Sequence, residues 1–187
     1  MNRKLKTIDL AYMAVGAVLI TVCSWISIPS AVPFTLQTFA VFCVLGLLGG
    51  KRGTISIAVY ILLGIIGIPV FSGFKGGFGV IIGTTGGYIV GFIFMGLIYW
   101  LAEVIWKQLS CGTKLKTMVV RGAVMAFGLL VCYAFGTAWF MVAYARNSGP
   151  VGLATALGWC VIPFIIPDII KLVVSVIITG RLKRFIK

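Results

Sequence analysis

Two oppositely charged residues, Asp168 and Lys171, lie inside an apolar stretch near the C-terminus. This stretch, residues 159–180, holds no other charge and is long enough to cross a ~30 Å hydrocarbon core. A charge at the centre of a bilayer costs roughly 2.5–3.5 kcal/mol on insertion scales, so such residues normally face a cavity or a partner. At positions i and i+3 the two side chains share one helix face. They are therefore the leading candidates for a ligand site, with Asp168 accepting N–H groups and Lys171 pairing with a carboxylate.

A simpler interpretation is that Asp168 and Lys171 form an ion pair that neutralises itself, and their spacing allows both interpretations. Pro167 bears on the choice, because proline suits the first turn of a helix and an acid there meets the positive end of the helix dipole. A helix from Pro167 to Gly180 has roughly 14 residues, or ~21 Å, which is too short to span the bilayer. We therefore expect the pair in the outer half of the membrane, with residues 163–167 as irregular backbone lining a cavity.

The composition places the whole chain in the membrane-protein class. Hydrophobic residues make up 61% of the 187 positions and charged residues 10%, whereas soluble domains have roughly 45–50% and about 25%. The length suits one compact bundle and nothing marks a second domain. We therefore expect an all-α membrane protein in which residues 1–187 form a single integral membrane domain.

Six membrane-spanning helices are expected from the apolar runs. They cover residues 7–26, 36–48, 54–68, 85–104, 117–143 and 159–180. Between them, residues 49–53 are predicted to form a sharp basic turn and residues 146–150 another turn. Residues 69–83 are too rich in glycine to be helical by composition.

The distribution of Lys and Arg predicts the orientation of this bundle. With six spans, both termini lie on the same side as residues 51–53 and 107–121, where most of the 16 Lys and Arg residues are found. The opposite side carries only Lys75 and Arg146. The positive-inside rule then places both termini in the cytoplasm of a multi-pass protein of the cell membrane. The net charge of +13 reflects spans flanked by cations that meet the lipid bilayer, so no nucleic-acid partner is expected.

Two segments on the outer side contain further residues that could contact a ligand. Residues 30–38 form a proline-stiffened entry to the second span, and residues 71–88 are rich in glycine, which lets a backbone approach a ligand closely. Hydroxyl groups at the end of the second segment could cap a helix or contact a ligand, whereas Gly87 and Gly91 form a small-residue stripe typical of helix packing. The side chains expected in the site are Thr35, Gln37, Phe71, Thr84, Thr85 and Tyr88.

The residues needed for most catalytic and metal chemistry are missing. The sequence has no histidine, and its five cysteines show no metal-ligand spacing, so they are interpreted as small buried residues. Without histidine no nucleophile–base pair can be assembled, and without a Walker motif the chain has no visible means of hydrolysing ATP. We therefore expect no enzyme, no metal and no cofactor. Uphill transport would need energy from partner proteins or from an ion gradient.

An ordered set of motifs resembles one known family. It consists of VPFTLQT at residues 32–38, LGGKRG at 48–53, LGIIGIPVF at 63–71, GGFG at 76–79, GTTGGY at 83–88 and PDIIK at 167–171. Together these motifs resemble the BioY family, the biotin-binding S components of energy-coupling-factor vitamin transporters. The resemblance implies a six-helix S-component fold with an outward-facing pocket roofed by the first and third loops. It also implies biotin as the ligand, with Asp168 and Lys171 in the site.

The resemblance implies protein partners as well. Members of this family work with a transmembrane coupling protein and two cytoplasmic ATPases, which agrees with the missing Walker motif. Their first helix usually offers the coupling protein an Ala-x-x-x-Ala face. Here Ala11, Ala14 and Ala17 are spaced by three, and the residue four positions after Ala14 is Val18. These four are the expected docking residues, and the departure from the family spacing leaves the exact face open.

Biotin agrees with the chemistry of the predicted site. Its ureido ring offers two N–H donors to Asp168, and its valerate carboxylate offers a partner to Lys171. Two other hypotheses stay open. An S component for another small vitamin would keep the fold but lose the ureido match. A stand-alone carrier coupled to protons would instead use Asp168 as the proton site and Lys171 as its counter-ion.

Overall fold

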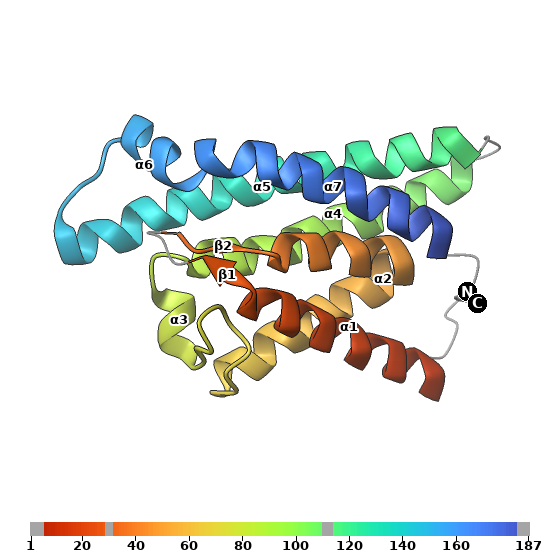
Figure 1. The fold of residues 1–187 in the computed structure, drawn as a ribbon, viewed down its shortest axis with the longest axis horizontal. Helices are drawn as coiled ribbons and strands as arrows, with labels where there is room; N and C mark the ends of the chain where they lie inside the picture. Colours follow the sequence, from red (N-terminus) through yellow and green to blue (C-terminus); the bar gives the residue numbers. More distant parts are fainter. Residues whose placement is uncertain (1–5, 29–31, 110–113, 183–187) are drawn as a thin grey trace.

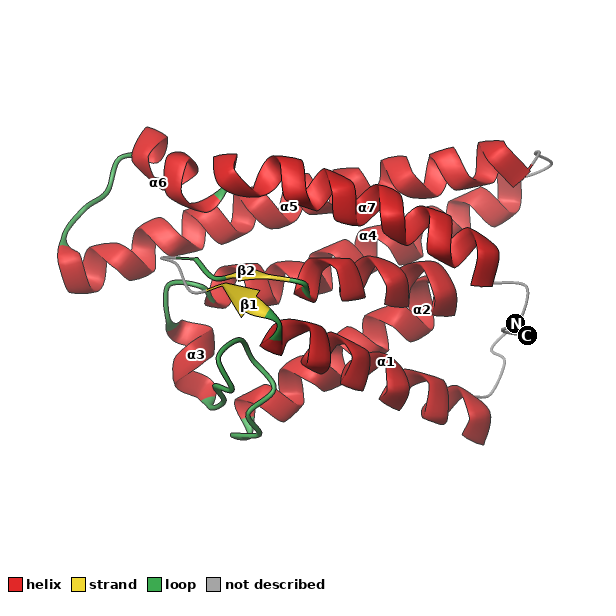
Figure 2. Cartoon of the chain, viewed as in Figure 1, coloured by secondary structure: helices red, strands yellow, loops and turns green. Residues whose placement is uncertain are grey.

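The computed structural model describes residues 6–28, 32–109 and 114–182. Figures 1 and 2 show an elongated bundle of helices with one short hairpin. The elements in chain order are α1 (Thr7–Trp25), β1 (Ser27–Ile28), β2 (Phe34–Thr35), α2 (Gln37–Ile65), α3 (Phe78–Ile82), α4 (Gly86–Leu109), α5 (Lys114–Ser148), α6 (Leu153–Cys160) and α7 (Ile162–Leu182). Within the described residues, α1, α2, α4, α5 and α7 are long and apolar enough to cross a membrane. The prediction of an α-helical membrane bundle is confirmed.

Gly49 divides α2 into two arms. It has φ 80° and ψ 172°, a conformation that glycine adopts without the steric cost that other residues meet. The chain reverses direction there (Figure 1), so the arms match the predicted second and third spans. The turn predicted for residues 49–53 is too long, because residues 50–53 already belong to the second arm. That arm can begin so early because the Gly50 N–H, one of the free donors of a helix start, donates to Glu103 Oε2 at 2.6 Å.

Three other boundaries differ from the prediction. Helix α3 forms inside the glycine-rich stretch predicted to be non-helical, because its apolar side chains include Ile81, which is buried in the core. Helix α5 continues into the predicted turn at residues 146–150 and ends at Ser148, just before Gly149 with φ 90°, a conformation common after helix ends. The strands β1 and β2 pair antiparallel, Ser27 opposite Thr35, which adds a small hairpin to the all-α prediction.

Helix α2 is the centre of the bundle. It packs against α1, α4 and α7, while α5 runs along α4 (Figure 1). Close helix approach depends on small residues: a Cβ atom on Gly91 would lie 2.6 Å from Cys132 Sγ, and one on Gly87 would overlap the side chain of Trp139. Both contacts join α4 to α5, so the predicted packing role of these two glycines is confirmed.

The two ends of the bundle differ in what they carry. The β1–β2 hairpin, residues 66–85 and the α5–α6 connection gather at one end, on the left in Figure 1. We call this the loop end. The start of α1, the reversal at Gly49 and the end of α7 lie at the opposite end. There Arg52 of α2 forms an ion pair with Asp9 of α1, with 2.7 Å between Nη2 and Oδ1.

Replacing Gly50 with alanine should destabilise the packing of α2 on α4. A Cβ atom at this position would overlap the backbone of Trp100, which cannot move aside as a side chain can. Overpacking of this kind costs about 1–3 kcal/mol. We expect the thermal unfolding midpoint of Gly50→Ala in detergent to fall clearly below that of the wild type. Gly79→Ala is the matched control, because a Cβ atom added there would have no neighbour within 4 Å. Equal midpoints for the two variants would contradict the close α2–α4 contact.

Candidate functional site

A cavity of about 250 Å³ lies between the loop end and the middle of the bundle. This volume is just below the ~300–1,000 Å³ usual for small-molecule sites, so it suits a compact ligand. Its walls come from the helices α2 to α7, from β2 and from the loops between β1 and β2, α2 and α3, and α3 and α4. All eight side chains predicted for the site line it: Thr35, Gln37, Phe71, Thr84, Thr85, Tyr88, Asp168 and Lys171.

The two predicted charges contact each other directly in this cavity. Lys171 Nζ lies 2.7 Å from Asp168 Oδ1, and the residues are only 7% and 3% exposed. Tyr133 of α5 donates its hydroxyl to Asp168 Oδ2 at 2.6 Å. Lys171 also donates to the Thr35 backbone oxygen at 2.7 Å and lies 4.3 Å from the centre of the Phe34 ring. The buried pair thus joins α7 to α5 and to the hairpin strand β2.

These contacts show that the two interpretations of the pair do not exclude each other. The pair neutralises itself, and it also faces the cavity. Lys171 and Asp168 differ in the hydrogen-bonding capacity that they keep for a ligand. The three N–H groups of Lys171 face Asp168, Thr35 and the aromatic ring of Phe34. An ionised carboxylate has about four acceptor positions, so Asp168 keeps free ones after its contacts with Lys171 and Tyr133.

The position of Asp168 within its helix differs from the prediction. Helix α7 begins at Ile162 and not near Pro167, so Asp168 lies roughly six residues, or ~9 Å, inside the helix. Pro163 occupies the first turn, where proline is tolerated, and Pro167 removes only the hydrogen bond that would reach the Pro163 carbonyl. The irregular backbone expected at residues 163–167 is therefore helical, and the helix-dipole argument for Asp168 is wrong. Lys171 and Tyr133 provide the stabilisation instead.

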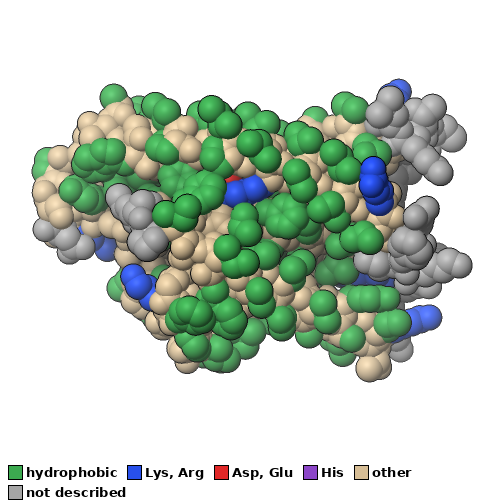
Figure 3. Space-filling model, in the orientation of Figure 1, with side chains coloured by type: hydrophobic (Ala, Val, Ile, Leu, Met, Phe, Trp, Pro, Cys, Tyr) green, Lys and Arg blue, Asp and Glu red, His purple; other side chains and the backbone are tan. Residues whose placement is uncertain are grey.

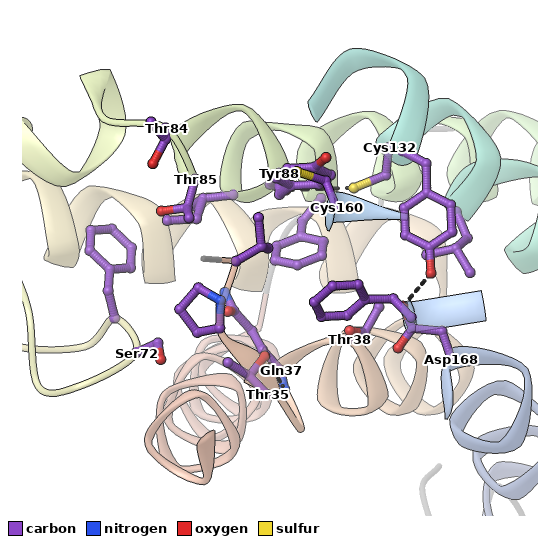
Figure 4. A pocket seen from close by; sticks show the side chains of 18 of the residues that line it. Thr35, Gln37, Thr38, Ser72, Thr84, Thr85, Tyr88, Cys132, Cys160 and Asp168 are labelled. Carbon is purple, nitrogen blue, oxygen red and sulfur yellow. Dashed lines mark hydrogen bonds between the residues drawn. The ribbon is translucent and has the colours of Figure 1, made fainter. Parts of the chain in front are cut away.

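The other predicted residues form further parts of the walls. Gln37 Nε2 donates to the Tyr60 hydroxyl at 2.9 Å, and the buried ring of Phe71 meets Tyr60 edge-on, with 5.5 Å between centroids. Tyr88 shares a hydrogen bond of 3.0 Å with Thr137 of α5. Figure 4 shows Thr84, Thr85 and Ser72 toward one end of the cavity and Asp168 at the other. The cavity thus has an ion pair at one end and hydroxyl groups at the other.

Several lining residues were missed by sequence reasoning. They are Val32, Pro33, Thr38, Ser72, Lys75, Val80, Ile89, Phe92, Leu129, Cys132, Tyr133, Cys160 and Phe164. Tyr133 is the most consequential, because it holds Asp168. Its signal in the sequence is a hydroxyl group in the middle of a predicted span. Leu129, Cys132 and Tyr133 share the helical i, i+3, i+4 spacing, but only the rotation of α5 in the bundle shows that this face meets the cavity.

The predicted docking residues divide between two faces of α1. Ala11, Ala14 and Val18 are exposed, whereas Ala17 is 2% exposed and belongs to the core. Ala17 therefore does not lie on an outer docking face in this chain, because helical spacing turns it toward α2. The other three residues remain a prediction. On the face seen in Figure 3, hydrophobic side chains cover most of the surface, as expected of a protein surrounded by lipid.

Among the described residues, no group of three or more metal-ligating side chains occurs. The polar groups of the cavity are one neutralised ion pair, the ammonium of Lys75, the amide of Gln37, hydroxyl groups and two cysteine thiols. They can bind a small polar group by hydrogen bonds inside an otherwise apolar pocket. A helical membrane bundle with such a cavity defines a class of protein, the membrane-embedded binding subunit. A solved structure supports this: the S-component for biotin from an ECF-type ABC transporter shares the fold with a TM-score of 0.81.

That structure is 27% identical in sequence and covers 98% of this chain and 95% of its own. The model of the BioY family matches residues 1–187. A biotin transporter BioY from Thermotoga maritima is 42% identical over 168 residues, covering 89% of this chain and 90% of the relative. A probable biotin transporter BioY from Pyrococcus horikoshii is 38% identical over 180 residues, covering 96% and 98%. The chain belongs to the BioY family.

Removing one member of the buried pair should cost more than removing both. Asp168→Asn leaves the Lys171 ammonium buried without a counter-charge, and breaking such a pair costs about 3–5 kcal/mol. The double variant Asp168→Asn/Lys171→Met leaves no unpaired charge, so we expect a smaller loss. The measurement is the free energy of unfolding of the ligand-free protein in detergent. A single variant no less stable than the double variant would show that mutual neutralisation does not stabilise the fold.

Proposed function

We propose that this chain is the biotin-binding subunit of an energy-coupling-factor importer. The single observation that carries this proposal is the neutralised ion pair facing a compact cavity, in a chain that belongs to the BioY family. The matched relatives are named biotin transporters, and the similar solved structure is an S-component for biotin. The protein is thus a transport subunit and carries out no catalysis of its own.

The ureido ring of biotin fits the ion pair as a unit. This ring offers N–H donors and a carbonyl acceptor, and it is neutral. Asp168 has free acceptor positions for the N–H groups. Two N–H groups of Lys171 are held by Asp168 and the Thr35 carbonyl, and the third, beside the Phe34 ring, can turn toward the ligand carbonyl. A neutral ligand group beside a neutralised pair leaves no uncompensated buried charge, which would be costly in this apolar setting. Because the two charges touch, they serve the same part of the ligand and not its two opposite ends.

The apolar parts of the cavity suit the rest of the molecule. Four apolar side chains line the cavity: Phe71, Phe92, Leu129 and Phe164. Removing apolar surface from water is favourable by roughly 25 cal/mol per Å² before the costs of association, so burial of the bicyclic body and tail of biotin favours binding here. The hydroxyls of Thr84 and Thr85 and the amide of Gln37 supply further hydrogen-bonding groups along the cavity.

Transport by this subunit requires energy from partner proteins. The sequence has no Walker motif, so ATP must be hydrolysed elsewhere. We propose a transmembrane coupling protein and two cytoplasmic ATPases as partners. Ala11, Ala14 and Val18 lie exposed on α1, where small side chains would let another helix approach closely. This face is the proposed contact with the coupling protein.

The proposed orientation places the loop end outside the cell. Lys51, Arg52 and Arg181 lie at the opposite end, whereas Lys75 and Arg146 lie at the loop end. With α2 crossing twice through its two arms, the chain has six crossings, and the positive-inside rule places both termini in the cytoplasm. The cavity then receives its ligand from outside.

Cysteine labelling in intact cells tests this orientation. Arg146→Cys should react with a membrane-impermeant maleimide added outside, whereas Lys51→Cys should react only after permeabilisation. Both variants carry Cys111→Ser, because Cys23, Cys43, Cys132 and Cys160 are buried and Cys111 lies outside the described residues. Labelling of Lys51→Cys in intact cells, with Arg146→Cys protected, would reverse the proposed topology.

Titration calorimetry of the purified chain in detergent tests the function. We expect binding of biotin and no binding of thiamine or riboflavin, because neither offers the pair a carbonyl flanked by two N–H groups. Asp168→Asn should lower the affinity for biotin by about tenfold or more, since a hydrogen bond to a charged group contributes about 1.5–3 kcal/mol.

Folding of each variant is checked by its elution as a single species before titration. Absence of biotin binding in folded wild-type protein would overturn the proposed function. An affinity of Asp168→Asn within twofold of the wild type would mean that the pair is structural and that the ligand binds elsewhere.

A further inference from the structure

The charges that line the cavity do not cancel. Three charged side chains are found there: Asp168, Lys171 and Lys75. The first two neutralise each other at 2.7 Å. Lys75 adds one positive charge that nothing in the cavity balances. A cavity with one net positive charge is complementary to a ligand with one net negative charge.

No acidic side chain can serve as the partner of Lys75. The sequence has only three acids. Asp168 is paired with Lys171, Asp9 is paired with Arg52, and Glu103 accepts from the Gly50 N–H. The last two contacts lie at the end of the bundle opposite to Lys75. The Lys75 side chain is exposed at the loop end, so it can meet a ligand without the cost of prior burial.

The loop that carries Lys75 is fixed at several points. The Phe71 N–H donates to the Lys75 backbone oxygen at 2.9 Å, which closes the turn. On the preceding residues, Ser24 donates to the Val70 oxygen at 2.5 Å and Trp25 donates to the Pro69 oxygen at 2.9 Å. The ring of Phe74 stacks on Trp25 with 5.0 Å between centroids. The backbone of Lys75 is therefore held in place, which lowers the entropic cost of binding through its side chain.

We propose that Lys75 binds the carboxylate of the ligand at the mouth of the cavity and thereby selects the acid over its neutral derivatives. This inference rests on the proposed function and assigns the two ends of biotin. The ureido ring meets the Asp168–Lys171 pair. The valerate tail extends toward the end of the cavity where Figure 4 shows Ser72, whose loop also carries Lys75.

Lys171 is the poorer partner for this carboxylate. Its N–H groups already face Asp168, the Thr35 carbonyl and the Phe34 ring. A carboxylate bound beside the neutralised pair would bring an uncompensated negative charge into a buried site, which costs several kcal/mol per ion. The same carboxylate at Lys75 meets an unpaired cation in partly hydrated surroundings. We therefore propose Lys75 as the partner of the carboxylate in place of Lys171, the partner predicted from the sequence.

The test compares biotin with biotinamide, which lacks the negative charge, on three proteins. Lys75→Gln should lower the affinity for biotin by about threefold to fivefold, the upper part of the range typical of one exposed charge pair. Its affinity for biotinamide should stay within twofold of the wild type. Arg146→Gln is the matched control, because Arg146 is an exposed cation at the same end that does not line the cavity. This control should change neither affinity.

Salt gives a second readout. Raising the ionic strength should weaken biotin binding to the wild type and leave binding to Lys75→Gln nearly unchanged, because exposed charge pairs are screened. The inference fails if the wild type binds biotin and Lys75→Gln binds both ligands as the wild type does, or loses affinity for both equally. If the wild type binds neither ligand, the proposed function itself fails.

Discussion

Burying a charged pair inside a membrane is the constraint on which the rest of this structure depends. Neither Asp168 nor Lys171 could remain in a hydrocarbon environment alone, and each has several partners. Tyr133 binds the acid from α5, and the Thr35 carbonyl binds the ammonium from the hairpin. The requirement to satisfy two charges therefore brings α5, α7 and β2 together. The cavity lies where these three elements meet the glycine-rich loop, so the stabilising pair and the ligand site are the same place.

Tight packing elsewhere leaves room for this cavity at one end. Gly50 lets α2 touch the backbone of α4, and Gly91 lets α5 approach α4. At Gly136 a Cβ atom would overlap the ring of Tyr88, so α5 and α4 also meet closely beside the cavity. Helix association in a membrane relies on such close contacts, since lipid is as apolar as the side chains.

The three acids of the chain are all engaged in defined contacts, two of them at the end away from the cavity. Asp9 links α1 to the reversal in α2, and Glu103 links α4 to the same reversal. The structure thus uses its few negative charges to fix helix positions. Positive charges are in excess, and most flank the membrane. Among the described residues, Lys75 is the cation that borders the cavity without an acidic partner, and it gives the lining of the cavity a net positive charge.

The sequence by itself determined the class of protein, the apolar spans, the reversal near Gly49 and the buried pair, because hydrophobic runs, glycine and charge report directly on a bilayer environment. It also indicated eight side chains that the cavity brings together. The tertiary structure decided what depends on helix rotation and on distant contacts. Ala17 packs in the core, and the Tyr133 hydroxyl binds Asp168. Helix α7 begins at Ile162, five residues before Pro167. The tertiary structure also placed Lys171 in contact with Asp168, because only the packed helices exclude water and lipid from the pair.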